Sequence, residues 1–204
     1  MKSVWEETGE HRDFAPLKGD ISTDVLIIGG GMVGILCAYL LHGAGVPYVL
    51  TEAETVCGGI TKNTTAKITI QHGLIYDKLL RRFGIDRAGQ YLCAQKAALQ
   101  KYRELCSGMD CNFEEKDAYV YALEERRKLE QELSAMERLG FHGDFVEHLP
   151  LPFPVAGAVR VHNQAQFHPL KFVCCLAKGL HIYEHTPVRE LIGTTAVTDS
   201  GKVA

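Results

Sequence analysis

Apolar residues are concentrated between Asp24 and Glu52, where no Asp, Glu, Lys or Arg occurs. Val25–Ile28 is a short run of branched residues, which is typical of a strand buried on both faces of a parallel sheet. Three glycines follow, and Tyr48–Leu50 predicts a second strand. Between them, Met32 to His42 predicts a helix whose buried side holds Val33, Leu36, Cys37 and Leu40. The order of these elements indicates a β-α-β unit.

The middle of the chain has a different pattern, with charged and apolar residues at helical spacing. Gly73 to Gly108 and Glu124 to Leu139 predict two helices with charged outer faces. Alternating residues predict strands at Cys111–Phe113, Ala118–Ala122, Phe145–Glu147 and Gly157–His162. Together these elements predict an inserted α+β domain over residues 73–164.

The C-terminal part returns to short apolar segments. Gln166 opens a predicted helix that continues to Lys178, and His181–His185 predicts a strand. Asp199 to Gly201 supply the turn residues of a hairpin that enters a further strand. We expect residues 1–72 and 165–204 to form one domain around the insert.

Composition limits the class of protein. With 204 residues, 46% of them hydrophobic and 23% charged, the chain is long enough to bury a core. The net charge of −3 is spread along the chain without a basic stripe, so we expect no nucleic-acid partner. The uncharged stretch exceeds the ~20 residues of a membrane-spanning helix. Its glycines, Pro47 and acidic flanks nevertheless predict no transmembrane segment.

The N-terminus and the cysteines indicate the compartment. Met1 to Asp13 mixes acidic and basic residues and lacks the apolar centre of a signal peptide. The seven cysteines are an odd number without a CxxC pair, which favours reduced thiols in a cytoplasmic protein. We expect no metal site.

The glycines of the β-α-β unit follow the spacing Gly29-x-Gly31-x-x-Gly34, which is typical of dinucleotide binding. Gly29 permits a sharp turn, and Gly34 keeps the helix close to the strand. Gly31 lets the backbone approach a diphosphate, whose charge is favoured at the start of a helix. These residues predict a nucleotide site.

Glu52 follows the second strand, 18 residues after Gly34. A carboxylate at this position accepts hydrogen bonds from the hydroxyls of an adenosine ribose and repels a 2′-phosphate. NADP is therefore disfavoured. The glycines and Glu52 leave NAD and FAD as alternatives.

The run from Asp24 through Glu52 into Gly58-Gly59-Ile60-Thr61 resembles the start of the D-amino acid oxidase and glycine oxidase family. The resemblance implies a Rossmann-like FAD-binding domain of the glutathione reductase type with an inserted α+β substrate domain. Ser3–Thr8 and Thr64–Tyr76 resemble the branch whose longer members end in a Rieske domain. The paired Cys and His motifs of a Rieske centre do not occur in this chain, so we expect no iron–sulfur cluster here.

The resemblance implies a set of FAD-binding residues. Thr61 would lie at the pyrophosphate, Thr65, Ala66 and Lys67 near the flavin ring, and Val188 at the adenine through its backbone. The full set is Gly29, Gly31, Met32, Val33, Gly34, Glu52, Ala53, Gly59, Ile60, Thr61, Thr65, Ala66, Lys67 and Val188.

The resemblance further implies the oxidation of a C–N bond in a small amine or amino acid, with hydride transfer to the flavin. The chain is expected to cover roughly half of the family's length and to lack the groups that hold a substrate carboxylate. Lys67 either stabilises charge on the reduced flavin or is a surface lysine. His72 and His168 lie in a loop or at a helix start, where a histidine more often satisfies backbone groups than moves protons. An NAD-dependent dehydrogenase and an inactive nucleotide-binding fragment remain alternative functions.

Overall fold

The computed structural model describes residues 2–9 and 12–204. Met1, Glu10 and His11, which belong to the predicted N-terminal domain and to the stretch tested for a signal peptide, lie outside the described residues. The chain divides into two compact units, which are described separately. Unit 1 comprises residues 1–65, 109–111 and 168–204, and unit 2 comprises residues 66–108 and 112–167.

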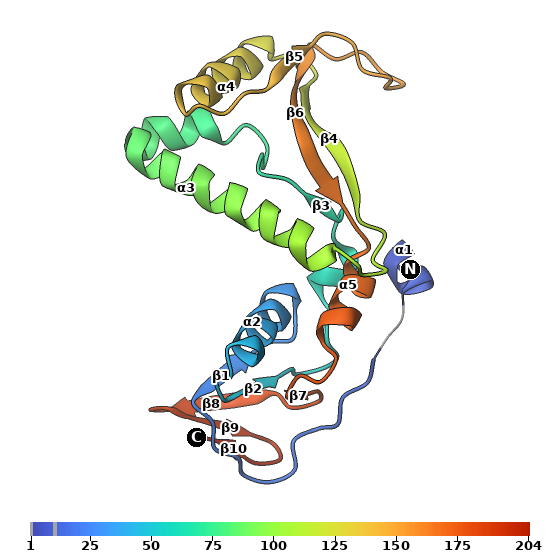
Figure 1. The fold of residues 1–204 in the computed structure, drawn as a ribbon, viewed down its shortest axis with the longest axis vertical. Coiled ribbons are helices and arrows are strands. Elements are labelled where there is room, and N and C mark those ends of the chain that lie inside the picture. Colours follow the sequence, from blue (N-terminus) through green and yellow to red (C-terminus); the bar gives the residue numbers. More distant parts are fainter. Residues whose placement is uncertain (1, 10–11) are drawn as a thin grey trace. The chain divides into compact units, whose positions relative to one another are not determined.

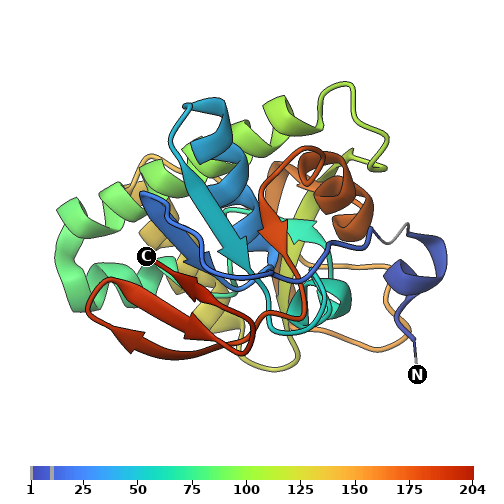
Figure 2. The same cartoon turned by 90° about the horizontal axis from the view of Figure 1, so that it is seen from below.

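Unit 1 contains a parallel sheet in the order β1-β2-β7, formed by Val25–Ile28, Tyr48–Thr51 and Ile182–Tyr183. Helix α2 (Met32–Gly43) connects β1 to β2 and packs against both strands (Figure 2). All four residues of β2 are buried, as expected for the central strand of a small parallel sheet. The predicted β-α-β unit is confirmed, whereas the predicted strand His181–His185 is only two residues long.

The predicted buried side of α2 is wrong for three of its four residues. Ile35 and Ala38 are fully buried and Leu36 is half-buried, but Val33 is 75% exposed, Leu40 is 53% exposed and Cys37 is exposed. Nearly every position of this helix is apolar, so its sequence pattern does not select one face. The buried face is instead set by the position of the sheet.

A second, antiparallel sheet in unit 1 has the order β10-β9-β8, formed by Lys202–Val203, Thr195–Thr198 and Val188–Ile192. The turn before β10 lies where Asp199 to Gly201 predict it. Leu17, Val49, Ala196 and Val203 form a buried cluster in this unit. The unit also contains α1 (Val4–Thr8), the short helix η1 (Ile60–Asn63) and α5 (Pro169–Leu176) (Figure 1).

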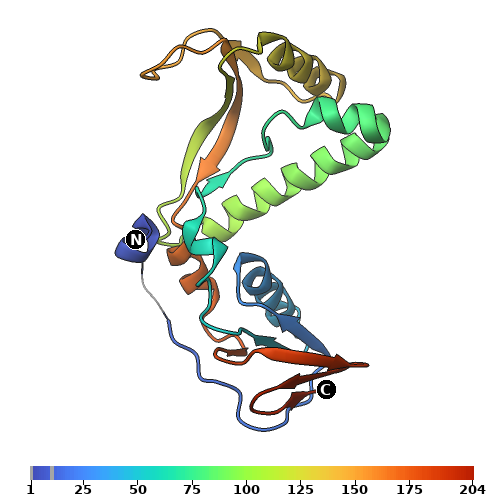
Figure 3. The ribbon, with the colours of Figure 1, turned by 180° about the vertical axis from the view of Figure 1, so that it is seen from behind.

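Unit 2 is built on a sheet in the order β3-β6-β4, formed by Lys67–Ile68, Gly157–Gln166 and Glu114–Ala122. Strand β5 (Asp144–Val146) pairs with β6. Helices α3 (Tyr76–Cys106) and α4 (Arg126–Arg138) lie on one side of this sheet (Figure 3). Both helices are close to their predicted positions, and α3 bends at Gly84, whose φ is 76°.

The strand predicted at Cys111–Phe113 is wrong, because these residues form an irregular segment before β4. Asn112 has a φ of 50°, which is incompatible with continued strand geometry. The backbone carbonyl of Cys111 accepts a hydrogen bond from the amide of His168. A single strand, β4, therefore replaces the predicted pair.

The start of α3 is closed by a carboxylate from α4. Glu132 is fully buried, and its Oε1 and Oε2 accept hydrogen bonds of 2.9 Å from the amides of Tyr76 and Asp77. Burial raises the pKa of Glu132, against the opposing effect of these backbone donors. Two amides that α3 cannot satisfy internally thus find acceptors within unit 2.

Along the described ranges, 2–9 and 12–204, no helix combines the length and the apolar character needed to cross a membrane.

Candidate functional site

The glycine turn in unit 1 joins β1 to α2 with little space to spare. Gly29 has a φ of 106°, a region that L-residues with a side chain rarely adopt. A Cβ on Gly34 would lie 2.0 Å from the carbonyl oxygen of Gly29. The chain's own geometry therefore explains the glycines at positions 29 and 34.

The first amides of α2 lack intrahelical acceptors and point outward from the helix start. The Met32 amide donates a 3.1 Å hydrogen bond to the Oγ1 of Thr61, which η1 brings to this position. Within residues 2–9 and 12–204, no acceptor is found for the amides of Val33 and Gly34. Such a helix start favours an anion through its unpaired N–H groups and its dipole.

Gly31 has a different basis from its two neighbours in the motif. Its φ is −75°, which any residue can adopt, and a Cβ would meet only the Oγ1 of Thr61 at 3.7 Å. Nothing in the chain's own packing requires glycine here. The absence of a side chain leaves room for a group outside the chain to approach the helix start, so the site fits a diphosphate.

Glu52 lies at the same turn. Its Oε2 accepts a 2.6 Å hydrogen bond from the amide of Gly30, and its Oε1 accepts a 2.9 Å bond from the amide of Glu54. Both carboxylate oxygens are thus oriented by backbone donors, and each retains a second lone pair. The carboxylate can accept further hydrogen bonds from a ligand bound at the turn.

The corner Thr186–Val188, which is predicted to contact the adenine, lies beside the end of β2. The Thr186 amide donates a 2.8 Å hydrogen bond to the carbonyl of Glu52, and the His185 amide donates a 3.0 Å bond to the carbonyl of Glu54. Val188 begins β8 and is half-buried. Unit 1 therefore brings the predicted adenine corner close in space to the predicted ribose carboxylate.

Sequence reasoning missed Glu184, which is 1% exposed. Its carboxylate accepts hydrogen bonds from the amides of Phe14, at 3.0 Å, and Val56, at 2.5 Å. These bonds tie the N-terminal segment and the loop after Glu52 to the end of β7. The available signal was an acidic residue within the predicted strand His181–His185, where a carboxylate is rarely buried without partners.

The remaining predicted cofactor residues are divided between the units. Ala53, Gly59, Ile60 and Thr65 belong to unit 1 and are exposed. Ala66, which is buried with a φ of 57°, and the exposed Lys67 begin unit 2. The structure brings the glycine turn, Glu52, Thr61 and the Val188 corner together within unit 1.

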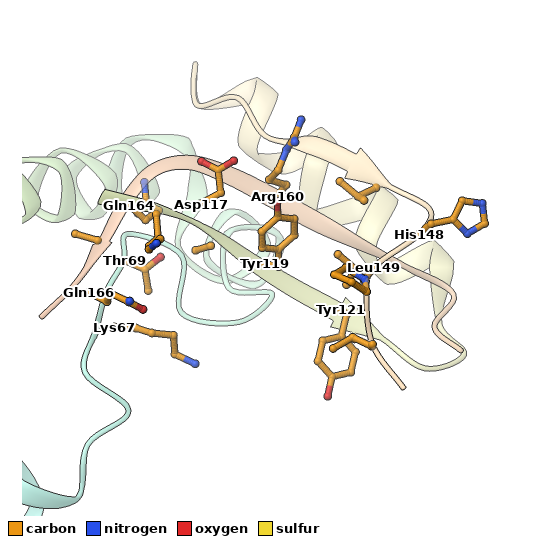
Figure 4. A pocket seen from close by; sticks show the side chains of 16 residues that line it. Lys67, Thr69, Asp117, Tyr119, Tyr121, His148, Leu149, Arg160, Gln164 and Gln166 are labelled. Atoms are coloured by element: carbon orange, nitrogen blue, oxygen red, sulfur yellow. The ribbon is translucent and has the colours of Figure 1, made fainter. Parts of the chain in front are cut away.

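Unit 2 contains an open cavity of about 630 Å³ on its sheet (Figure 4). Lys67 from β3, Tyr119 and Tyr121 from β4, and Arg160 from β6 line it, and an apolar lip is formed by Val146, Leu149, Pro150 and Leu151. Tyr119 and Tyr121 are 44% and 46% exposed, so their rings are available to a ligand. The sequence predicted the strands but not these tyrosines as a lining.

The charged groups of this cavity are mostly paired. The ion pairs and hydrogen-bonded pairs are Arg160–Asp144 at 2.6 Å, Lys116–Glu114 at 3.1 Å and His162–Asp117 at 2.9 Å. Lys67 has no ion-pair partner in the described part of the chain. Its ammonium group is therefore the cation of this cavity that remains free to bind an anionic ligand.

The histidines and cysteines have structural environments. His168 caps α5, where its Nδ1 accepts a hydrogen bond from the Lys171 amide, as expected for a residue that satisfies backbone groups. His72 contacts Gln95 through its Nε2 at 3.2 Å. None of the seven cysteines, all of which lie in the described ranges, forms a disulfide, and burial raises the pKa of Cys57 to about 12. No group of three or more metal-ligating side chains occurs in the part of the chain that the structure describes.

Known proteins resemble this chain in sequence and in fold. The sequence matches the family described as FAD dependent oxidoreductase (DAO) over residues 24–204. A Bacillus subtilis (strain 168) protein, provisionally named Rieske 2Fe-2S iron-sulfur protein YhfW, is 38% identical over 194 residues. These residues cover 91% of this chain and 38% of that protein.

Among solved structures, glycine oxidase from Geobacillus kaustophilus matches with a TM-score of 0.66 at 20% identity, over 90% of this chain and 53% of that one. L-Proline dehydrogenase from P. horikoshii matches with a TM-score of 0.71 at 17% identity, over 92% of this chain and 51% of that one. The chain thus spans about half the length of these structures and less of the Bacillus relative. Their likeness shows a mixed α/β fold of the FAD-dependent oxidase type.

Proposed function

This chain belongs to the DAO family of FAD-dependent oxidoreductases, and from that premise we propose that it binds FAD at the start of α2 and serves the oxidation of a C–N bond. The family resemblance stated from the sequence is confirmed by this membership. The main observation that supports this proposal is that Gly31, Thr61 and Glu52 lie together at the start of α2.

In the proposed site, the amides of Val33 and Gly34 and the hydroxyl of Thr61 hold the diphosphate of FAD. Glu52, oriented by the Gly30 amide, accepts hydrogen bonds from the adenosine ribose. The backbone of Val188 meets the adenine edge. We assign the remaining predicted contacts, Met32, Ala53, Gly59, Ile60, Thr65, Ala66 and Lys67, to the same cofactor.

The two compact units support a proposal in which one unit binds the cofactor and the other binds the substrate. Unit 1 carries the cofactor residues of the glycine turn, and unit 2 forms part of a substrate domain. We propose that the predicted domains, residues 1–72 with 165–204 and residues 73–164, serve these two roles. Lys67 stands early in unit 2 and lines its cavity.

We propose that this cavity accepts the substrate, an amine or amino acid. Bound FAD supplies the hydride acceptor for the carbon next to nitrogen. Tyr119, Tyr121 and the apolar lip bind a large apolar substituent of the substrate, while Lys67 stays with the cofactor. The cavity therefore favours an amino acid with a bulky side chain over glycine.

Cofactor titration tests the proposal. The purified chain is titrated separately with FAD and NAD, and binding is followed by flavin fluorescence and by the shift in Tm. We expect FAD alone to bind, and Glu52→Gln to weaken it about tenfold, because charged hydrogen bonds contribute about 1.5–3 kcal/mol. Glu54→Gln is the matched control, since the Glu54 side chain is exposed and makes no hydrogen bond in the described ranges.

Two results would contradict the proposal. Stabilisation by NAD but not by FAD indicates a dehydrogenase. Binding of neither nucleotide indicates an inactive fragment.

A further inference from the structure

The opening motif Ser3–Thr8 forms helix α1, which the proposed function leaves without a role. The helix has five residues, and helices shorter than about 12 residues are marginal in water on their own. A capping box stabilises its start: the Ser3 side chain accepts from the Glu6 amide, and the Glu6 side chain accepts from the Ser3 amide. Its tertiary contacts must supply the remaining stabilisation.

Two of these contacts reach the segment around η1. The indole Nε1–H of Trp5 donates a 2.8 Å hydrogen bond to the backbone carbonyl of Thr64. The Glu6 carboxylate pairs with the ammonium group of Lys62 at 2.9 Å. α1 thus binds both the middle and the end of the Ile60–Thr64 turn.

Two further contacts hold α1 on α5. The Thr8 hydroxyl lies 3.0 Å from the Nε2 of His168, and the Trp5 ring meets the His168 ring edge-on at a centroid distance of 5.1 Å. A Cβ on Gly9 would lie 2.6 Å from the Trp5 carbonyl and 3.0 Å from the Cε1 of His168. The end of α1 is therefore closely packed against the start of α5.

The turn that α1 binds is the one that carries Thr61. Thr61 accepts the hydrogen bond of the Met32 amide, so the position of the Ile60–Thr64 turn determines where its hydroxyl lies at the start of α2. Within and beside the turn, Asn63 donates to the Gly59 carbonyl at 3.1 Å, the Thr64 amide lies 3.5 Å from the Thr61 carbonyl, and the Thr61 side chain is hydrogen-bonded to Cys57. The contacts of α1 add two anchors, at Lys62 and Thr64.

We propose that α1 is a clasp whose positioning residues, Trp5 and Glu6, hold the Ile60–Thr64 turn so that Thr61 is presented at the start of α2. Thr8 and His168 supply the fixed point of the clasp on α5. The consequence for cofactor affinity rests on the proposed function, because Thr61 is there a diphosphate contact. The ordering of the turn itself does not depend on it.

Hydrogen exchange on the whole 204-residue chain, without cofactor, tests the clasp directly. Trp5→Phe keeps an aromatic ring beside His168 but removes the N–H donor to Thr64. We expect it to speed exchange of the Met32 and Thr64 amides about two- to tenfold, the range of one hydrogen bond's net contribution. Exchange of the β2 amides stays unchanged and serves as the reference for global stability.

A matched pair of substitutions isolates the ion pair. Glu6→Gln removes the charge that binds Lys62 but keeps an acceptor for the capping box, and we expect a smaller acceleration at the same amides. Glu7→Gln is the same change on the next residue, which is exposed and contacts neither η1 nor α5 through a hydrogen bond in the described ranges. The Glu7 variant should exchange like the wild type.

The second readout is the affinity for FAD, which Trp5→Phe should weaken by a similar factor. Wild-type exchange at Met32 and Thr64 in the Trp5 variant overturns the clasp. Faster exchange in a chain that binds no FAD supports the clasp and refutes the proposed function alone. Tight FAD binding with no change in either readout refutes the clasp and retains the function.

Discussion

At the start of α3, in unit 2, the buried carboxylate of Glu132 accepts hydrogen bonds from the amides of Tyr76 and Asp77. At the start of α2, in unit 1, the neutral hydroxyl of Thr61 accepts one amide, and Val33 and Gly34 have no acceptor in the described part of the chain. Both helices have the same unsatisfied groups and the same dipole. The anion is internal at α3, whereas in the proposed function the diphosphate of the ligand supplies it at α2.

The largest expected effect comes from removing the buried carboxylate of Glu132. Glu132→Ala leaves the buried amide of Tyr76 and the half-buried amide of Asp77 without acceptors and creates a cavity, so we expect the free energy of unfolding of unit 2 to fall by roughly 2–5 kcal/mol. Urea unfolding and hydrogen exchange at Tyr76 and Asp77 measure this loss. Glu137→Ala on the same helix is the control, because Glu137 is exposed. Equal stability of the two variants would contradict a structural role for the carboxylate.

The next effect concerns the glycine turn. Gly34→Ala places a Cβ against the Gly29 carbonyl, and we expect a loss of about 1–3 kcal/mol in the stability of unit 1. Gly43→Ala is the same change at the other end of α2, where a Cβ meets nothing within 4 Å. That variant should unfold at the same or a slightly higher urea concentration. A neutral Gly34→Ala would show that α2 can shift away from β1.

The smallest expected effect concerns a third helix start, that of α5, where the His168 side chain is the capping acceptor. Thr8 donates its hydroxyl proton to the Val4 carbonyl, so His168 must donate from Nε2 to Thr8 and accept at Nδ1 from Lys171. This arrangement needs the neutral ring. Burial, followed by the nearby Lys171 charge, lowers the pKa of His168, and Asp110 opposes this shift.

Because the folded pKa lies below the unfolded value of 6.5, the contribution of His168 is present above pH 6.5. It is lost as the pH falls from there through the folded pKa, with a slope of at most about 1.4 kcal/mol per pH unit. His168→Asn keeps a capping acceptor that does not titrate, so its Tm should lose this pH dependence. A parallel pH profile for the variant and the wild type would assign the slope to other groups.

The sequence predicted the β-α-β unit well because its information is local. Branched residues, three glycines and an apolar helix occur in order, and Glu52 stands directly after β2. The buried face of α2 was not predictable, since the helix is apolar on all sides and only the sheet selects Ile35 and Ala38. The strand prediction at Cys111–Phe113 was wrong because the alternation of apolar and polar residues does not reveal the positive φ of Asn112.

The sequence predicted the part of the candidate site that lies in one recognisable motif. Gly31 and Glu52 follow from spacing, and Thr61 from the family resemblance. Glu132, Glu184 and Tyr119 act through partners far away in the sequence, and a single chain without its fold contains no signal for such pairings. Long-range hydrogen bonds to backbone amides were therefore the part that only the structure supplied.

The burial of the cysteine side chains has a practical consequence. Cys57 is buried and its high pKa leaves little thiolate, so it reacts slowly with maleimides, whereas Cys37 on α2 and Cys93 on α3 are exposed. One fully exposed thiol thus lies in each unit, while Cys174 and Cys175 of unit 1 are half-buried. A donor and an acceptor dye attached at these two natural positions would report by energy transfer whether the units change their separation when a nucleotide is added.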